Sequence, residues 1–109
     1  MIGALISGDL SADPVERRTR KGERFVTATA RVPAGDGAVF VGIAAFDATA
    51  AERLAKLRKG SPVSAAGVLE QTTWTTQAGE ARTGWRLTAS EVLSAFQAMK
   101  KRREAADDA

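Results

Sequence analysis

Three aromatic residues stand in sequence settings that suit exposed rings. Phe40 and Phe46 lie in an uncharged stretch, share one parity, and are separated on that parity by Gly42 and Ala44 alone. Because successive side chains of a strand point to opposite faces, both rings are expected on one face above small residues. Trp74 lies in a Thr-rich stretch shortly before an expected turn. Such rings either fill a core or form a platform on which other planar rings, such as nucleobases, stack.

Basic residues accompany the rings, and the sequence carries a formal net charge of +3 with a pI near 9.8. This balance suits a polyanionic partner, because Lys and Arg neutralise phosphates and release their counterions. A solvated basic surface explains any single cation equally well, and a helix dipole explains those of residues 56–59. The cations that could line a groove beside the rings include Arg17, Arg31, Arg58, Lys59, Arg82 and Arg86.

No constellation of residues predicts catalysis. The sequence contains neither Cys nor His, which excludes disulfides, thiolate or imidazole metal sites, and the nucleophilic triads that need these side chains. Asp9, Asp13 and Asp47 could gather around a divalent ion, but a turn or a helix cap explains each of them better. The phosphate-cradling pattern G-x-x-x-x-G-K-[ST] does not occur. We therefore expect a protein that is not an enzyme and that carries no metal or cofactor.

The length of 109 residues and the composition favour one domain in the cytoplasm. No apolar run approaches the roughly 20 residues that span a membrane. The first residues lack the basic leader of a signal peptide, and the absence of Cys fits a reducing compartment.

Five strands are expected to position the candidate side chains. Alternation is clearest over residues 25–32, where Thr27, Thr29 and Arg31 share the exposed face with Phe25. Turn-forming residues separate the runs. The expected strands are residues 2–10, 25–32, 38–46, 62–74 and 81–93, with turns at 11–14, 21–23, 33–37 and 77–80.

One helix is expected between the third and fourth strands, over residues 47–60. Thr49, with Glu52 three residues later, has the spacing of a capping box, and Asp47 is the alternative cap. Gly60 suits the position that follows the end of a helix.

Three strands, a helix and two further strands are the element order of the OB-fold. This fold is a partly open Greek-key barrel of five strands that often binds oligonucleotides. We therefore predict an all-β OB-fold domain over residues 1–95, followed by a tail over residues 96–109 that is first basic and then acidic.

Short motifs that follow one another at matching spacing resemble the bacterial single-stranded DNA-binding protein (SSB) family over about residues 3–94. No single motif is diagnostic, but the ordered set is fairly specific. The matching motifs are Ser7-Gly8-Asp9-Leu10 with Asp13-Pro14, Thr27-Ala28-Thr29-Ala30, Phe40 and Phe46, Leu57-Arg58-Lys59-Gly60-Ser61, Gly67-Val68-Leu69, and Trp74 followed by Gly79.

The resemblance implies sequence-tolerant binding of single-stranded DNA in replication, recombination or repair. It implies a homotetramer or homodimer, with replication or repair proteins as further partners. Base stacking would fall on Phe40, Phe46 and Trp74. Phosphate contacts would fall on Arg17, Arg58, Lys59 and Arg82, and Thr27 and Thr29 would lie on the binding face.

Three departures from the family pattern keep an alternative open. The connection over residues 33–38 is short and has no aromatic residue, and Glu70-Gln71-Thr72-Thr73 replaces the usual basic residues before Trp74. Both changes imply weaker binding or a shorter site. The family's acidic tail tip closing on Pro-Phe, which recruits partners, is replaced by Asp107-Asp108-Ala109. The alternative is an OB-fold protein-interaction module, such as a primosomal replication-restart protein, with weak or lost DNA binding.

Overall fold

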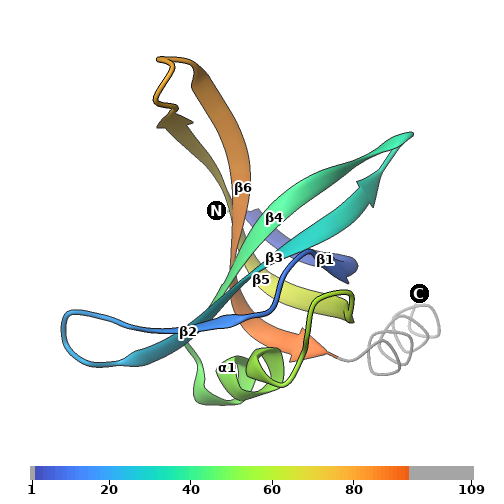
Figure 1. Ribbon diagram of the computed structural model, residues 1–109. Helices are drawn as coiled ribbons and strands as arrows, with labels where there is room; N and C mark the ends of the chain where they lie inside the picture. Colours follow the sequence, from blue (N-terminus) through green and yellow to red (C-terminus); the bar gives the residue numbers. More distant parts are fainter. Residues whose placement is uncertain (1, 94–109) are drawn as a thin grey trace.

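The computed structural model describes residues 2–93 of the chain, and the expected tail over residues 96–109 lies outside this range (Figure 1). Most of the described residues belong to strands. The elements are β1 (Ile2–Leu10), β2 (Val15–Arg18), β3 (Arg24–Ala34), β4 (Gly37–Ala45), α1 (Ala48–Ala55), β5 (Pro62–Thr75) and β6 (Ala81–Leu93).

The strands form one sheet that closes on itself. Its order is β1-β5-β6-β4-β3-β2, and a further antiparallel pairing joins Asp9 and Leu10 of β1 to β3. Strands β4 and β6 run parallel, and the other pairs run antiparallel. The closed barrel of β1, β5, β6, β4 and β3, with one helix between β4 and β5, is an OB-fold. The predicted fold class is therefore confirmed.

The barrel interior is filled by the branched and small residues of alternate strand positions. In β4, Val41, Ile43 and Ala45 point inward, while the opposite parity faces out. Helix α1 lies at one end of the barrel, where Leu54 is fully buried (Figure 1). Among the described residues, no helix is long and apolar enough to cross a membrane.

The helix is shorter than the predicted range of 47–60. Asp47 is its N-cap, because the Oδ2 atom accepts hydrogen bonds from the N–H groups of Thr49 and Ala50, both at 3.1 Å. The helix ends at Ala55, where the Arg58 guanidinium donates to the Ala55 carbonyl at 3.0 Å. Gly60 lies beyond the helix in a turn with φ +86°, where its N–H donates to Leu10. Its assignment as the residue after the helix end was therefore wrong.

Two strand assignments also differ from the prediction. The short strand β2 was not expected, because its consecutive exposed residues show no alternation; it is held by backbone pairing with β3. Pro33 was expected to end the second strand but lies within β3, opposite Ala38. At this position β3 has no partner on its other side, so the missing N–H of Pro33 costs no ladder bond.

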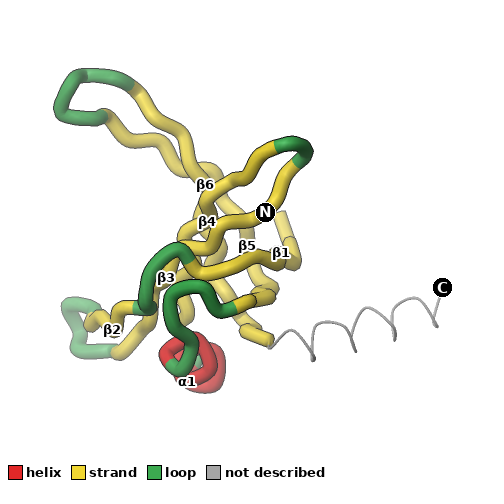
Figure 2. The backbone as a smooth tube through the Cα atoms, turned by 45° about the vertical axis from the view of Figure 1, so that its right-hand side comes forward, coloured by secondary structure: helices red, strands yellow, loops and turns green. Residues whose placement is uncertain are grey.

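Two hairpins extend beyond the barrel. Figure 2 shows the β3–β4 and β5–β6 hairpins projecting from the barrel, each closed by a short loop. Gly35 and Gly79 in these loops have φ values of +58° and +84°, which side chains with a Cβ atom rarely adopt. The hairpins lengthen the outer face of the sheet on the side away from α1 (Figure 1).

Candidate nucleic-acid interface

The strand register lines up the outward side chains of five neighbouring strands into one surface. Thr29 of β3 lies opposite Gly42 of β4, Gly42 pairs with Arg86 of β6, and Arg86 pairs with Glu70 of β5. We call this surface the aromatic face. Its residues are Arg17, Phe25, Thr27, Thr29, Arg31, Phe40, Gly42, Ala44, Phe46, Glu70, Thr72, Trp74, Arg82, Gly84, Arg86 and Thr88.

The three rings singled out in the sequence are all exposed on this face. Phe40 is 56% exposed, Phe46 is 50% exposed and Trp74 is 51% exposed. Phe40 lies opposite Arg31 in the β3–β4 hairpin, whereas Trp74 lies opposite Arg82 in the β5–β6 hairpin. The alternative that these rings fill the core is therefore wrong, since each leaves about half of its surface to solvent.

A fourth ring, which the sequence interpretation did not include among the site residues, supports Phe46. The rings of Phe25 and Phe46 are stacked, with centroids 4.8 Å apart and an interplanar angle of 16°. Phe25 is half-buried, so one side of Phe46 is covered and its exposed surface faces outward. Phe25 shares the parity of Thr27, and the alternation of residues 25–32 predicted its place on the exposed face but not its contact with Phe46.

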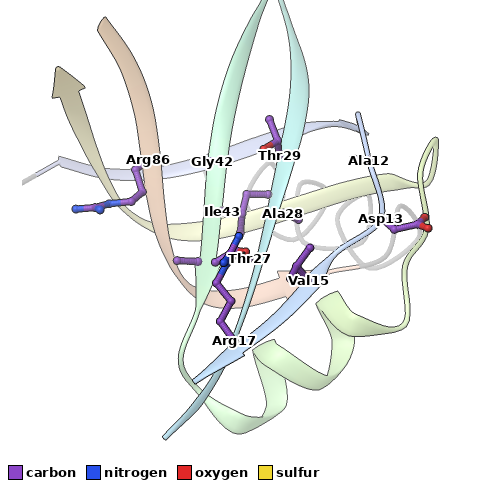
Figure 3. A pocket seen from close by; sticks show the side chains of 11 residues that line it. Ala12, Asp13, Val15, Arg17, Thr27, Ala28, Thr29, Gly42, Ile43 and Arg86 are labelled. Atoms are coloured by element: carbon purple, nitrogen blue, oxygen red, sulfur yellow. Dashed lines mark hydrogen bonds between the residues drawn. The ribbon is translucent and has the colours of Figure 1, made fainter. Parts of the chain in front are cut away.

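A hollow lies on the outer surface of the barrel, over the small residues Gly42 and Ala44 of β4. It has a volume of about 290 Å³ and is bordered by Arg17 on β2 and by Arg86 on β6 (Figure 3). A second hollow of about 410 Å³ adjoins it, since both are lined by Thr27, Ala44 and Arg86; the Phe25 and Phe46 rings line the second. The small residues Gly42 and Ala44 of β4 thus leave room for a ligand beside the Phe46 ring.

Three arginines on the face make weak local contacts. The Nε atom of Arg17 donates to Thr27 Oγ1 at 3.1 Å. Arg86 lies 3.3 Å from the Glu70 carboxylate, and Arg82 lies 2.9 Å from a carboxylate oxygen of the neighbouring turn. All of these side chains are more than half exposed in their ion pairs, so each pair contributes at most about 1 kcal/mol. The guanidinium groups of Arg82 and Arg86 can therefore exchange a carboxylate for a phosphate.

Two of the predicted basic residues lie off the face, in the turn after α1. The Arg58 guanidinium donates to the carbonyls of Ala55 and Leu57, at 3.0 and 2.8 Å. The backbone N–H of Lys59 donates to Asp13 Oδ1 at 2.7 Å, and Asp13 lines the first hollow. Lys59 is thus tied to the rim of the hollow, and Arg58 to its own helix.

The second tryptophan belongs to the core. Trp85 has the inward parity of β6, is half-buried and packs against the buried cluster. Within residues 2–93, no group of three or more Asp or Glu side chains comes together in a way that could hold a metal ion.

The model of the "Single-strand binding protein family" matches residues 1–95. No curated protein sequence matches the chain.

Three solved structures share the fold. The small single-stranded DNA-binding protein from Streptomyces coelicolor is 24% identical, with a TM-score of 0.74 and coverage of 85% of this chain and 93% of that one. A mitochondrial single-stranded DNA-binding protein from S. cerevisiae is 15% identical, with a TM-score of 0.68 and coverage of 86% and 94%. A deletion mutant of the Thermus aquaticus single-stranded DNA-binding protein is 22% identical, with a TM-score of 0.67 and coverage of 86% and 40%.

Proposed function

The chain belongs to the single-strand binding protein family, and from this premise we propose that its aromatic face binds single-stranded DNA. The observation that carries the proposal is the shared exposure of Phe40, Phe46 and Trp74 on one continuous surface. Exposed apolar rings that gather on one surface commonly mark a binding site. Unstacked bases of a single strand are a partner that stacks on such rings.

Base stacking supplies the affinity that does not depend on sequence. Each base that stacks on an aromatic side chain contributes about 1–3 kcal/mol, and every base has a π-face. Trp74 binds one base on the β5–β6 hairpin, and Phe40 binds another on β4. Phe46, supported by Phe25, binds a third at the edge of the second hollow.

The arginines hold the phosphates that connect these bases. The path runs from Arg82 beside Trp74, past Arg86 and Arg31, to Arg17 beside the first hollow. Lys59 and Arg58 continue the path beyond the rim of this hollow. Each neutralised phosphate of a single strand contributes about −0.7 to the slope of log K against log salt concentration. Thr27 and Thr29 provide hydroxyls along the same path.

Family membership supports further parts of the proposal. The chain acts without catalysis in DNA replication, recombination or repair, as a homotetramer or homodimer in the cytoplasm. Residues 1–95 form the DNA-binding domain, and residues 96–109 form a basic and then acidic tail. Replication or repair proteins are its further partners.

A second candidate function is a protein-interaction module. The observation that favours it is that Glu70 and Glu80 pair with Arg86 and Arg82, which lowers the positive charge around Trp74. In that case the aromatic face binds an apolar protein surface, and phosphate contacts are absent.

One titration separates the two functions. Oligo-dT is added to the protein at several salt concentrations, and the quench of tryptophan fluorescence is recorded, with duplex DNA of the same length as a control. A strong quench by oligo-dT alone, with an affinity that falls steeply with salt, supports DNA binding. No quench at low salt contradicts it. Trp74→Ala is expected to lower the affinity by about fivefold or more.

A further inference from the structure

The indole of Trp74 lies directly on the backbone of Gly84. A Cβ atom added to Gly84 would stand 2.8 Å from Cζ3 and 3.1 Å from Cη2 of Trp74, and contacts under 3.0 Å are essentially never seen for real Cβ atoms. The six-membered ring therefore occupies the space above Gly84 that any other residue would fill.

The register shows in which direction the indole leans. Trp74 pairs with Arg82, whereas Gly84 pairs with Thr72, so the ring crosses from β5 to a diagonal neighbour on β6. This diagonal points toward the barrel, where the pairing of β4 with β6 begins at Val41 and Trp85. The ring thus lies along the sheet at the base of the two hairpins, and about half of its surface remains exposed.

The backbone gives no other reason for a glycine at position 84. The glycines with positive φ are Gly22, Gly35, Gly60 and Gly79, so Gly84 has a conformation that other residues adopt. Glycine inside a strand is unfavourable by about 0.5–1 kcal/mol relative to alanine. In a strand it commonly marks a place where another group approaches the backbone closely.

We propose that Gly84 is a positioning residue for DNA binding: it lets the Trp74 indole lie flat on β6 with one face open for a base. The inference rests on the proposed function, because it assigns Trp74 the role of a stacking platform. A side chain at position 84 lifts the ring away from β6, and the platform is then no longer held in one orientation.

The test compares Gly84→Ala with Gly37→Ala, where an added Cβ meets nothing within 4 Å. The parent protein and all variants carry Trp85→Phe, so that Trp74, where it is present, is the only tryptophan. Binding of labelled oligo-dT is followed by fluorescence anisotropy, and Gly84→Ala is expected to weaken it about three- to tenfold, with Gly37→Ala unchanged. In a protein that already carries Trp74→Ala, Gly84→Ala is expected to have no further effect on the affinity for oligo-dT.

Two outcomes would overturn the inference. One is an equal loss of affinity on Gly84→Ala with and without Trp74, which indicates a general disturbance of the sheet. The other is an unchanged affinity. The emission maximum and acrylamide quenching of Trp74 without DNA provide a separate readout, and both should change in Gly84→Ala alone. If the parent protein does not bind oligo-dT, the proposed function fails, while this readout still tests the position of the ring.

Discussion

The guanidinium of Arg86 lies 3.3 Å from the carboxylate of Glu70, across the β5–β6 pairing and near the middle of the aromatic face. Arg86 also borders both hollows. A DNA phosphate that approaches Arg86 therefore competes with a carboxylate of the protein itself. Because both side chains are more than half exposed, this exchange costs little, but the displaced carboxylate stays close to the phosphate and repels it.

Removing the charge of Glu70 should tighten DNA binding. Glu70→Gln is expected to raise the affinity for oligo-dT about two- to fivefold at low salt, since an exposed pair contributes at most about 1 kcal/mol. Anisotropy titrations measure the change. The control is Glu52→Gln, which removes the exposed carboxylate that pairs with Lys56, on α1 and away from the aromatic face. An equal gain in both variants would indicate a general charge effect and contradict the specific role of Glu70.

Removing Arg86 should reduce the salt dependence of binding. Arg86→Gln is expected to lower the affinity and to make the slope of log K against log salt concentration shallower by about 0.7, the contribution of one phosphate contact. Lys56→Gln serves as the control, because Lys56 is the C-cap of α1 and lies off the aromatic face. An unchanged slope in Arg86→Gln, with the fold intact, would exclude a phosphate contact at this position.

Phe25 should matter for binding although it is half-buried. Phe46→Ala removes a stacking ring and is expected to weaken oligo-dT binding about 5- to 150-fold. Phe25→Leu keeps an apolar side chain but removes the ring that stacks on Phe46, so a smaller loss of a few-fold is expected. In the Phe46→Ala background, Phe25→Leu should have little further effect. Independent, additive losses measured by anisotropy would show that Phe25 does not act through Phe46.

The strand parity could be predicted from the sequence, and with it the exposed aromatic face. Alternation is a local property: it requires only that one side of each strand be buried, as in the run from Phe25 to Arg31. The strand β2 escaped prediction because its residues are all exposed and carry no periodic signal. It depends on pairing with β3, through the backbone and through contacts such as the hydrogen bond from Arg17 to Thr27.

Features that depend on contacts between distant residues could not be predicted. The stacking of Phe25 on Phe46 follows from the β3–β4 register, and the contact of Trp74 with Gly84 follows from the β5–β6 register. The helix ends at Ala55, and the Arg58 side chain bonds to the carbonyls of Ala55 and Leu57 from the turn that follows. Sequence spacing alone predicted instead that the helix would extend to the region of Gly60.

The choice between the two helix caps considered in the sequence is itself testable. Asp47→Ala removes two hydrogen bonds to the first turn of α1 and is expected to lower the free energy of unfolding by about 1 kcal/mol. Thr49→Ala should change it by less than about 0.5 kcal/mol, as an ordinary surface substitution does. Urea unfolding measures both. A larger effect of Thr49→Ala would contradict the assignment of Asp47 as the cap.

The most direct test of DNA binding on the aromatic face is a map of amide and indole NMR shifts on addition of oligo-dT. The largest changes are expected at Thr29, Gly42 and Gly84 and at the Trp74 indole N–H. The core residue Trp85 and helix α1 should change little, and they serve as internal controls. Changes confined to β1 and α1, or no changes at a saturating oligo-dT concentration, would contradict the account.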